Sequence, residues 1–326
     1  MRSRILGIGS AIPEHVLTNA DLEKRVDTSD EWIRTRTGIS ERHIVDADTN
    51  TSDLAVQAGT EAIQRSGLNP EEIDALIVAT ATPDTVFPST AIWAQPRLGL
   101  RTIPVFDISA ACTGWLYGYI VADGLIQGGT CKHVLVIGAE TLTKITNWQD
   151  RGSCILFGDG AGATVIGPNG DPLSGLLAHT WGADGRLAEL LMQPAGGTRM
   201  QASHETVDQN LHTIRMNGNE VFKYAVRAMQ QASEEVLAKA GMTGADVKLF
   251  VPHQANIRII TATAERCGMP MDKVCTTIRK YGNNSAASIP IALADCEAEG
   301  RLTKGDVVLV TAFGGGFTWG AALFRY

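Results

Sequence analysis

An internal repeat is the feature that most constrains how this chain can fold. The segment SGLNPEEIDALIVA at 66–79 aligns with AGMTGADVKLFVPH at 240–253, at a spacing of 174 along the chain. The segment CKHVLVIG at 131–138 aligns with GDVVLVTA at 305–312 at the same spacing. Two alignments that share one spacing indicate that a unit of this size occurs twice in the chain.

A third pair of segments extends the repeat. The segment GAGATVIG at 160–167 aligns with TWGAALFR at 318–325 at a spacing of 158. We therefore expect two similar halves, an N-terminal half at 1–170 and a C-terminal half at 171–326. A chain of 326 residues is long enough for two such units.

Each half alternates apolar strand segments with helical segments. Continuous apolar runs such as Leu76-Ile77-Val78 are typical of strands buried on both faces, so we predict an α/β fold. Its mixed sheets would carry helices between them and outside them. In the first half we expect strands at 3–10, 73–80, 104–109 and 132–138, a strand pair within 154–166, and helices at 18–26, 29–37, 52–66 and 112–127.

Helix-capping signals mark the starts of three of these helices. Thr18 with Asp21, and Thr28 with Glu31, have the spacing of a capping box, in which a side chain and a backbone group bond each other reciprocally. Ser52 is the residue that we expect to cap the helix at 52–66.

Composition excludes several classes of function. Lys and Arg number 28 against 35 Asp and Glu, and a net charge of −7 argues against a general nucleic-acid binder. No run of 18 apolar residues occurs, and Gly7, Gly9 and Pro13 interrupt the N-terminal apolar stretch, so we expect no membrane span, no signal peptide and a cytoplasmic location. The six cysteines lack CxxC and zinc-finger spacing, which predicts reduced thiols and no metal site.

Cys112 is the first candidate for a reactive group. It follows the predicted strand at 104–109 and stands where the helix at 112–127 begins, and a helix N-terminus lowers the pKa of a thiol. The small neighbours Ala111 and Gly114 would leave room for a substrate. The alternative is a buried cysteine that serves only as a small apolar side chain.

His253 is the second candidate, and the repeat strengthens it. It follows the predicted strand at 247–251, and polar groups at the carboxyl ends of buried strands commonly form α/β sites. The repeat aligns His253 with Ala79 and Cys112 with Ala286, so each half has a reactive side chain where the other half has alanine. If a pseudo-two-fold axis relates the halves, the thiol and the imidazole face each other. The alternative is a structural histidine.

Two further positions lie near the same expected cleft. Asn283 stands three residues before the position that aligns with Cys112, although Gly-Asn-Asn also suits a simple turn. The GGGF sequence at 314–317 could offer backbone N–H groups to an oxyanion, although close strand packing is the alternative.

A local excess of basic residues lies within 247–284. Arg258 and Arg266 are eight residues apart, which places them on roughly one face of a helix. This face could bind an anionic partner near His253, or it could be an ordinary solvated face.

Five motifs together resemble β-ketoacyl-acyl carrier protein synthase III, the initiating condensing enzyme of bacterial type II fatty acid synthesis. They are DEWIRTRTGISERH at 30–43, DISAACTGW at 107–115, PHQANIRII at 252–260, YGNNSAASIP at 281–290 and AFGGGFTWGAALFRY at 312–326. The resemblance implies a thiolase-like fold with two halves related by a pseudo-two-fold axis, which agrees with the repeat.

The resemblance also implies residue roles. Cys112 would accept the acyl group, His253 and Asn283 would complete a triad, and the backbone N–H groups of Cys112 and Gly315 would form the oxyanion hole. Phe87 would reach the acyl pocket of a partner in a homodimer. The residues that would contact coenzyme A are Thr28, Trp32, Arg36, Arg151 and Asn256. The residues that would bind the acidic acyl carrier protein are Lys223, Arg258 and Arg266.

The implied reaction uses acyl-CoA and malonyl-acyl carrier protein as substrates and needs no permanently bound cofactor. Trp115 stands where the family more often has Phe, and the polar segment at 195–213, expected to be a surface loop, looks longer than usual. The acyl group preferred, whether acetyl, branched or longer, is therefore open. The alternatives are a synthase III-like enzyme of secondary metabolism that uses another acyl-CoA, and a noncatalytic acyl-carrier-binding protein of the same fold. A redox thiol protein is the least favoured.

Overall fold

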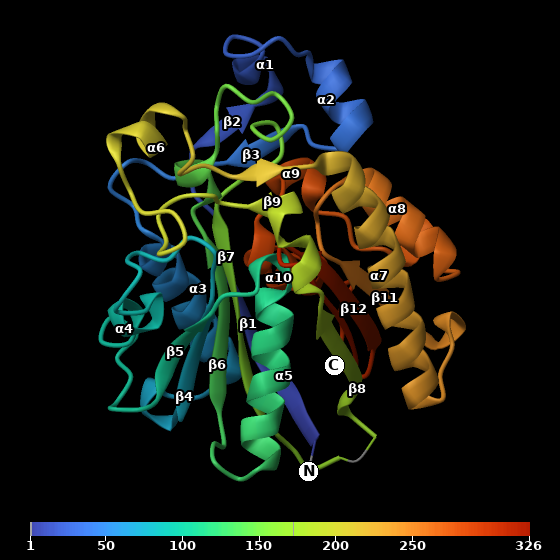
Figure 1. The fold of residues 1–326 in the computed structure, drawn as a ribbon. Coiled ribbons are helices and arrows are strands. Elements are labelled where there is room, and N and C mark those ends of the chain that lie inside the picture. Colours follow the sequence, from blue (N-terminus) through green and yellow to red (C-terminus); the bar gives the residue numbers. More distant parts are fainter. Residues whose placement is uncertain (1, 172) are drawn as a thin grey trace.

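The computed structural model describes residues 2–171 and 173–326 and contains two mixed β-sheets with helices between and outside them (Figure 1). The helices α5 (Gly114–Gln127) and α10 (Ser288–Ala298) lie between the sheets and contact both of them. Helix α3 (Thr51–Ser66) covers the outer face of the first sheet, and α7 (Gly218–Ala240) covers the outer face of the second. The predicted α/β fold with layered helices is confirmed.

The first sheet has the strand order β1-β7-β6-β4-β5. Its strands are β1 (Arg2–Ala11), β4 (Ala75–Ala79), β5 (Val105–Ile108), β6 (Val134–Glu140) and β7 (Gly160–Asn169). Strand β4 is parallel to both β5 and β6, whereas β7 is antiparallel to both β6 and β1.

The second sheet repeats this order with β8-β13-β12-β11. Its strands are β8 (Gly175–Ala183), β11 (Leu249–Pro252), β12 (Val307–Gly314) and β13 (Thr318–Arg325). Strands β11 and β12 are parallel, and the other neighbours are antiparallel, as at the corresponding positions of the first sheet. A single parallel bridge from Phe250 to Val274 occupies the place that β5 has in the first sheet.

Shorter elements complete the chain. The remaining helices are α1 (Asn19–Leu22), α2 (Asp30–Thr37), α4 (Thr90–Ala94), α6 (His204–Asp208), α8 (Ile257–Arg266) and α9 (Ile278–Tyr281), and the short strands are β2 (Val16–Thr18), β3 (Glu41–His43), β9 (Leu191–Met192) and β10 (Arg215–Met216). Two 3₁₀ turns, η2 (Ala111–Thr113) and η7 (Ser285–Ala287), precede the central helices α5 and α10. None of the described helices is long and apolar enough to cross a membrane.

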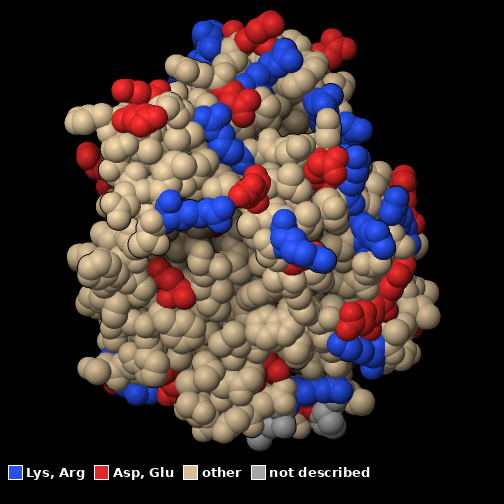
Figure 2. All heavy atoms as spheres, in the orientation of Figure 1, with Lys and Arg blue, Asp and Glu red and all other residues tan. Residues whose placement is uncertain are grey.

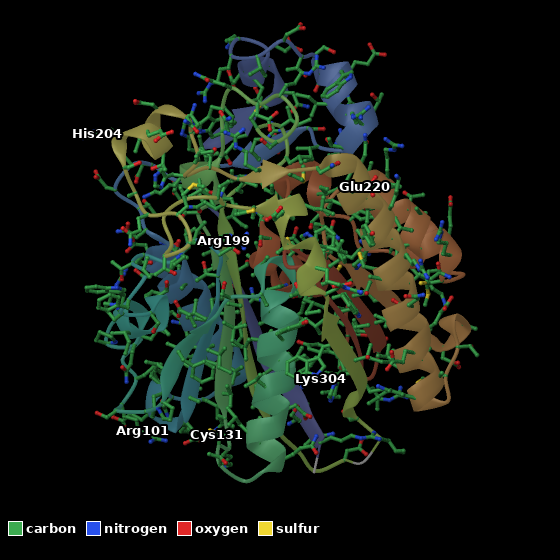
Figure 3. The ribbon with its side chains drawn as sticks, viewed as in Figure 1. Arg101, Cys131, Arg199, His204, Glu220 and Lys304 are labelled. Carbon is green, nitrogen blue, oxygen red and sulfur yellow. The ribbon has the colours of Figure 1, made fainter. Side chains whose placement is uncertain are left out.

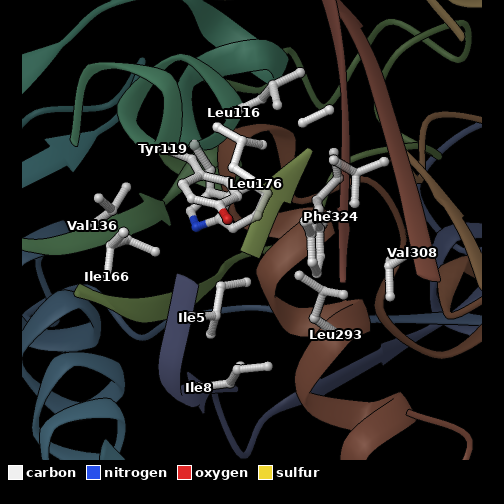
Figure 4. Close-up of a cluster of buried hydrophobic side chains, with 14 of the residues drawn as sticks. Ile5, Ile8, Leu116, Tyr119, Val136, Ile166, Leu176, Leu293, Val308 and Phe324 are labelled. Carbon is white, nitrogen blue, oxygen red and sulfur yellow. The ribbon is translucent and has the colours of Figure 1, made fainter. Parts of the chain in front are cut away.

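The core is continuous across the central helices. Figure 4 shows Tyr119 of α5 and Leu293 of α10 among side chains of both sheets, including Ile5 and Phe324. Because α5 is covered on two sides, it is apolar around most of its circumference, in contrast to an amphipathic surface helix. Gly118 is needed there, since an added Cβ would lie 2.7 Å from Val136 Cγ1.

Two of the predicted helix caps are wrong. The N-cap of α3 is Asn50 and not Ser52, which lies inside the helix and donates its hydroxyl to Asp84 at 2.6 Å. The N-cap of α2 is Ser29 and not Thr28. In each case the N-cap residue is one or two positions before or after the predicted one, which sequence spacing does not decide. The capping box of Thr18 is confirmed.

Two segment predictions also need correction. The predicted strand pair within 154–166 is a set of turns followed by the single strand β7, which starts at Gly160. The polar segment at 195–213 contains a helix, α6, with Ser203 as its N-cap. Figure 3 shows His204 in α6 and Arg199 on the preceding part of the segment.

Candidate functional site

Cys112 lies in the turn η2 between β5 and α5. The preceding residue, Ala111, has a φ of 46°, a left-handed conformation that is uncommon for a residue with a side chain. Strand β12 ends against this turn, and a Cβ added to Gly314 would lie 2.7 Å from the Cys112 nitrogen. A glycine at this position lets the end of β12 pack directly against the turn.

The second half repeats the turn in η7. Ser285, which aligns with Ala111 in the repeat, also has a φ of 46°. The two turns contact each other, and a Cβ on Gly114 would lie 3.3 Å from the Cβ of Ala286. The two repeated turns therefore meet, as expected if a pseudo-two-fold axis relates the two halves.

The Cys112 thiol is in an apolar environment that keeps it protonated. Burial raises its pKa to about 12, although the Ser285 hydroxyl lowers it, and the negative charge of Glu140 raises it further. The prediction that the helix N-terminus lowers this pKa is therefore wrong for the resting structure. Loss of water around the sulfur outweighs the helix dipole, which is a smaller effect. The residue keeps some exposed surface.

His253 is buried and has one ring nitrogen without a partner. Its Nδ1 lies 2.6 Å from the hydroxyl oxygen of Ser288, whereas Nε2 has no hydrogen-bond partner among the described residues. The backbone N–H of Gln254 donates to the same Ser288 oxygen at 3.4 Å, so the Ser288 hydroxyl is free to donate to Nδ1. That arrangement leaves the proton of a neutral imidazole on Nε2. Burial lowers the pKa of His253 to about 3.

Asn283 is held by its backbone and by one side-chain oxygen. Its N–H donates to the Leu156 carbonyl at 2.8 Å, and its own carbonyl accepts from Gly158 at 3.1 Å. Its Oδ1 accepts from the Ser285 N–H at 2.8 Å. This bond uses Oδ1 and leaves the NH₂ group of the same side chain available to donate to another molecule.

Two serines of η7 and α10 contact candidate residues. The Ser285 N–H donates to Asn283, and Ser288, three residues later, bonds His253, while the turn η7 packs against the turn η2 that holds Cys112. Both serines were present in the YGNNSAAS motif, but nothing in the motif indicated which of them would contact the candidate residues. Gly315 lies beside η2, with an added Cβ 3.7 Å from the Cβ of Ala111.

Glu140 is a buried acid that the sequence reasoning missed. It ends β6 and accepts hydrogen bonds from the Thr82 hydroxyl at 2.7 Å and from the Ala81 N–H at 3.1 Å. Burial raises its pKa to about 7, against the lowering effect of these bonds. The signal in the sequence that could have identified Glu140 is its position as an acidic residue at the end of an otherwise apolar strand segment.

Three of the five residues expected to contact coenzyme A, Trp32, Arg36 and Arg151, lie together. The guanidinium groups of Arg151 and Arg36 lie 5.0 Å and 5.4 Å from the centre of the Trp32 ring. Thr28 has a buried hydroxyl without a partner among the described residues. Asn256 caps α8 by accepting from the Arg258 N–H at 2.8 Å.

The basic residues expected to bind a carrier protein lie on two packed helices. Lys223 is in α7 and pairs with Glu220 at 2.7 Å, and Arg258 is in α8, 5.4 Å from the ring centre of Phe222. Arg266 bonds Gln230 of α7 at 3.3 Å. Figure 2 shows basic side chains gathered over α7 and α8 in the upper right of the view.

Phe87 lies in an exposed loop after β4, with 85% of its surface accessible. Neighbouring Val86 is 88% exposed, and Trp93 and Phe106 are also exposed. No group of three or more His, Cys, Asp or Glu residues suited to a metal ion occurs within residues 2–171 and 173–326.

Comparisons with known proteins agree on one family. The C-terminal domain of 3-oxoacyl-[acyl-carrier-protein] synthase III matches residues 237–326, and a second domain of the same synthase matches residues 106–185. The chain is 52% identical over 322 residues to the β-ketoacyl-[acyl-carrier-protein] synthase III of Caldanaerobacter subterraneus subsp. tengcongensis, covering 99% of this chain and 97% of the relative. It is 49% identical to the enzyme of the same name from Natranaerobius thermophilus, covering 99% of each chain.

Solved structures of similar proteins also match the chain over nearly its whole length. The crystal structure of 3-oxoacyl-[acyl-carrier-protein] synthase III from Aquifex aeolicus VF5 superposes with a TM-score of 0.92 at 50% identity, covering 99% of this chain and 100% of that one. The priming β-ketosynthase from the R1128 polyketide biosynthetic pathway superposes with a TM-score of 0.92 at 33% identity, covering 99% and 96% of the two chains.

Proposed function

Because the chain belongs to the β-ketoacyl-[acyl-carrier-protein] synthase III family, we propose that it is the initiating condensing enzyme of type II fatty acid synthesis. It transfers an acyl group from acyl-CoA to Cys112 and condenses that group with malonyl-acyl carrier protein. The observation that carries the proposal is the contact between the two repeated turns, η2, which holds Cys112, and η7, whose Ser285 N–H donates to Asn283, with Ser288 bonded to His253 just after η7.

In the first step, the Cys112 sulfur attacks the thioester carbonyl of acyl-CoA. A bond forms between sulfur and the carbonyl carbon, the thioester bond breaks, and coenzyme A leaves as the thiol. The backbone N–H groups of Cys112 and Gly315 stabilise the oxyanion between these events, since both belong to segments that meet at the end of β12.

In the second step, malonyl-acyl carrier protein loses CO₂ and leaves an enolate. The Nε2–H of His253 and the side-chain amide of Asn283 donate hydrogen bonds to the enolate oxygen. Each such donor contributes about 3–4 kcal/mol to the transition state. The carbanion then attacks the acyl-Cys112 carbonyl, the sulfur leaves, and β-ketoacyl-acyl carrier protein forms.

A neutral His253 fits the role of donor better than that of base. Its pKa of about 3 means that the imidazole does not hold an extra proton at neutral pH. With Ser288 donating to Nδ1, the unpartnered Nε2 carries the only ring proton. An unpartnered buried N–H is costly, and a developing enolate oxygen would satisfy it.

The substrates reach the site from the surface that carries the two basic clusters. Trp32 stacks against the adenine of coenzyme A opposite Arg151, with Arg36, Thr28 and Asn256 as further contacts. The assignment is supported by the three side chains lying together and by the Thr28 hydroxyl, which has no partner among the described residues; the adenine would take the place that the Arg151 guanidinium has over the Trp32 ring. Lys223, Arg258 and Arg266 bind the acidic carrier protein, which is supported by their common placement on α7 and α8.

The N-terminal half supplies the nucleophile, and the C-terminal half supplies His253 and Asn283. We place the enzyme in the cytoplasm, where thiols such as Cys112 stay reduced. No permanently bound cofactor takes part, since the thioester of acyl-CoA supplies the activated acyl group.

The active form is a homodimer in which Phe87 reaches the partner's acyl pocket. Strand β5 is the edge of the first sheet, and Phe106 on this edge is exposed, as are Val86, Phe87 and Trp93 nearby. An exposed edge strand with apolar neighbours is typical of a surface that pairs with another chain.

Labelling of the enzyme tests the function directly. Incubation with radiolabelled acetyl-CoA should label the Cys112 peptide, and Cys112→Ser should abolish the label. Label on another residue contradicts the nucleophile assignment, and absence of label with bound carrier protein would favour the noncatalytic alternative.

The second candidate function is priming in a secondary-metabolic pathway, supported by the similarity to the R1128 ketosynthase. The higher identity to enzymes named for fatty acid synthesis favours the first. A panel of straight and branched acyl-CoA primers, assayed with malonyl-acyl carrier protein, separates the two.

A further inference from the structure

The thiols of Cys275 and Cys296 face each other in the core beside α10. Their Sγ atoms lie 2.7 Å apart, although 21 positions separate the two residues in the chain. Cys275 directly follows Val274, which bridges to Phe250 of β11, and Cys296 lies in α10. Both are free thiols and at most 1% exposed. The fold thus makes a pair of thiols from two cysteines that sequence spacing does not associate.

Hydrogen bonds hold each of the two cysteines in place. The Cys275 N–H donates to the Phe250 carbonyl at 2.8 Å, and its sulfur lies 3.5 Å from the carbonyl oxygen of Ala292 in α10. The Cys296 carbonyl accepts from the N–H of Arg301 at 2.8 Å. Because the sulfurs of a disulfide lie about 2 Å apart, the two thiols need to approach each other by less than about 1 Å to form one.

A cavity of about 390 Å³ connects Cys275 with the surface. Cys275 is one of its lining residues, and the exposed residues Arg279 and Glu299 also line it. Apart from Cys275, every lining residue is polar or charged, so the cavity suits water and small polar solutes. A small oxidant therefore has a route to Cys275, whose sulfur contacts that of Cys296.

Arg301 lies beside the pair and favours a negatively charged sulfur. Its guanidinium donates to the carbonyl of Val274, the neighbour of Cys275, at 3.1 Å. The hydrogen bond with Cys275 and the charge of Arg301 lower the pKa of Cys296, although burial raises it. The pKa of Cys275 is instead raised, chiefly by the bond with Cys296. One sulfur of the pair is thus the more acidic, and the thiolate is the form of cysteine that reacts with oxidants.

We propose that Cys275 and Cys296 form a reversible oxidation site, which hydrogen peroxide converts into a disulfide. One sulfur takes an oxygen atom from the peroxide and becomes a sulfenic acid, and one water molecule leaves. The other sulfur then displaces that oxygen as a second water molecule, and the bond between the two sulfurs forms. The thiols lose two hydrogens in total and are oxidised, the peroxide is reduced, and a dithiol reductant reverses the change.

The disulfide would join two elements that position His253. Gln254, the next residue after His253, donates from Nε2 to the Cys275 carbonyl at 3.1 Å. Ser288, which bonds His253 Nδ1, lies in α10 together with Cys296. Oxidation therefore links the segment after β11 to α10 covalently. The proposed condensation uses neither sulfur, so this inference is independent of the proposed function.

The test is oxidation of the folded enzyme with hydrogen peroxide, followed by alkylation in denaturant and tryptic digestion without a reductant. Trypsin releases Cys275 within the peptide 274–279 and Cys296 within the peptide 281–301. Mass spectrometry should find the two peptides linked, two hydrogens lighter than their sum, with a matching loss of both alkylated forms. Dithiothreitol should separate the linked peptides again.

Cys296→Ser should abolish the linked peptide, because Cys275 then has no sulfur to bond. Cys131→Ser is the matched control and should retain the linked peptide. Cys131 is also a buried free thiol, but none of the described hydrogen bonds joins its sulfur to another cysteine.

The proposal is overturned if Cys275 and Cys296 both remain free at a peroxide dose that oxidises the partly exposed Cys112 in the same sample. It is also overturned if the linked peptide forms only when the enzyme is oxidised in urea, because the folded arrangement would then not be responsible. Neither result affects acetyl labelling of Cys112 in untreated enzyme, so failure of this inference is distinguishable from failure of the proposed function.

Discussion

Ala111 and Ser285 share one left-handed backbone conformation, with a φ of 46° at each, although they belong to opposite halves of the chain. Each directly precedes the aligned position, which is Cys112 in one half and Ala286 in the other. The duplicated turns contact each other between the two sheets. A single local geometry, used twice, thus positions the candidate nucleophile and the loop that carries Asn283.

Asn283→Ala should impair malonyl decarboxylation by about 100-fold or more while acyl transfer to Cys112 changes much less. The side-chain amide acts on the enolate, which exists only in the second step. Release of labelled CO₂ from malonyl-acyl carrier protein measures one step, and acetyl labelling of the enzyme measures the other. Exposed Asn69→Ala is the control, and equal loss in both steps would indicate a structural role.

Lower pH should destabilise the fold through His253. Burial lowers its pKa to about 3, so between about 6.5 and about 3 the unfolded chain binds a proton that the folded chain does not. The free energy of unfolding therefore falls as pH falls, by about 2 kcal/mol from pH 6.5 to pH 5. Urea unfolding at several pH values measures this slope, which His253→Gln should reduce and exposed His15→Gln should leave unchanged. An equal slope in both variants would assign the acid sensitivity to other groups.

Arg258→Glu should raise the KM for malonyl-acyl carrier protein by about tenfold and leave the KM for acyl-CoA nearly unchanged. The substitution reverses a charge on α8 without touching the turns that hold the reacting groups. Lys239→Glu, near the C-terminal end of α7, is a charge-matched control. If both variants change the KM for the carrier protein equally, net charge and not the position of Arg258 is responsible.

Gly314→Ala should abolish acyl transfer and destabilise the fold by about 1–3 kcal/mol. The added Cβ would lie 2.7 Å from the Cys112 nitrogen, so either η2 or the end of β12 must move. Gly124→Ala in α5 is the contrasting case, because its added Cβ meets nothing within 4 Å and alanine favours a helix by up to about 1 kcal/mol. Thermal unfolding and acetyl labelling of both variants check the pair, and a fully active Gly314→Ala enzyme would contradict the close packing.

The sequence alone determined the fold class, because the repeat and the continuous apolar strands permit few arrangements other than two mixed sheets with central helices. It also selected Cys112 and His253 as candidates, since a duplicated chain that differs at aligned positions shows where one half has gained a reactive side chain, whereas the role of Asn283 came from the family resemblance. These inferences depend on spacing and residue type, which a sequence contains in full.

Only the tertiary structure decided the electrostatics and the partners. The helix N-terminus predicted an acidic thiol, but burial raises the pKa of Cys112, because desolvation depends on every neighbour that packs around the sulfur. The bond of Ser288 to His253 and the packing of η2 against η7 join residues that are far apart in the chain. Such contacts follow from how the two halves pack, and local sequence patterns carry no information about them.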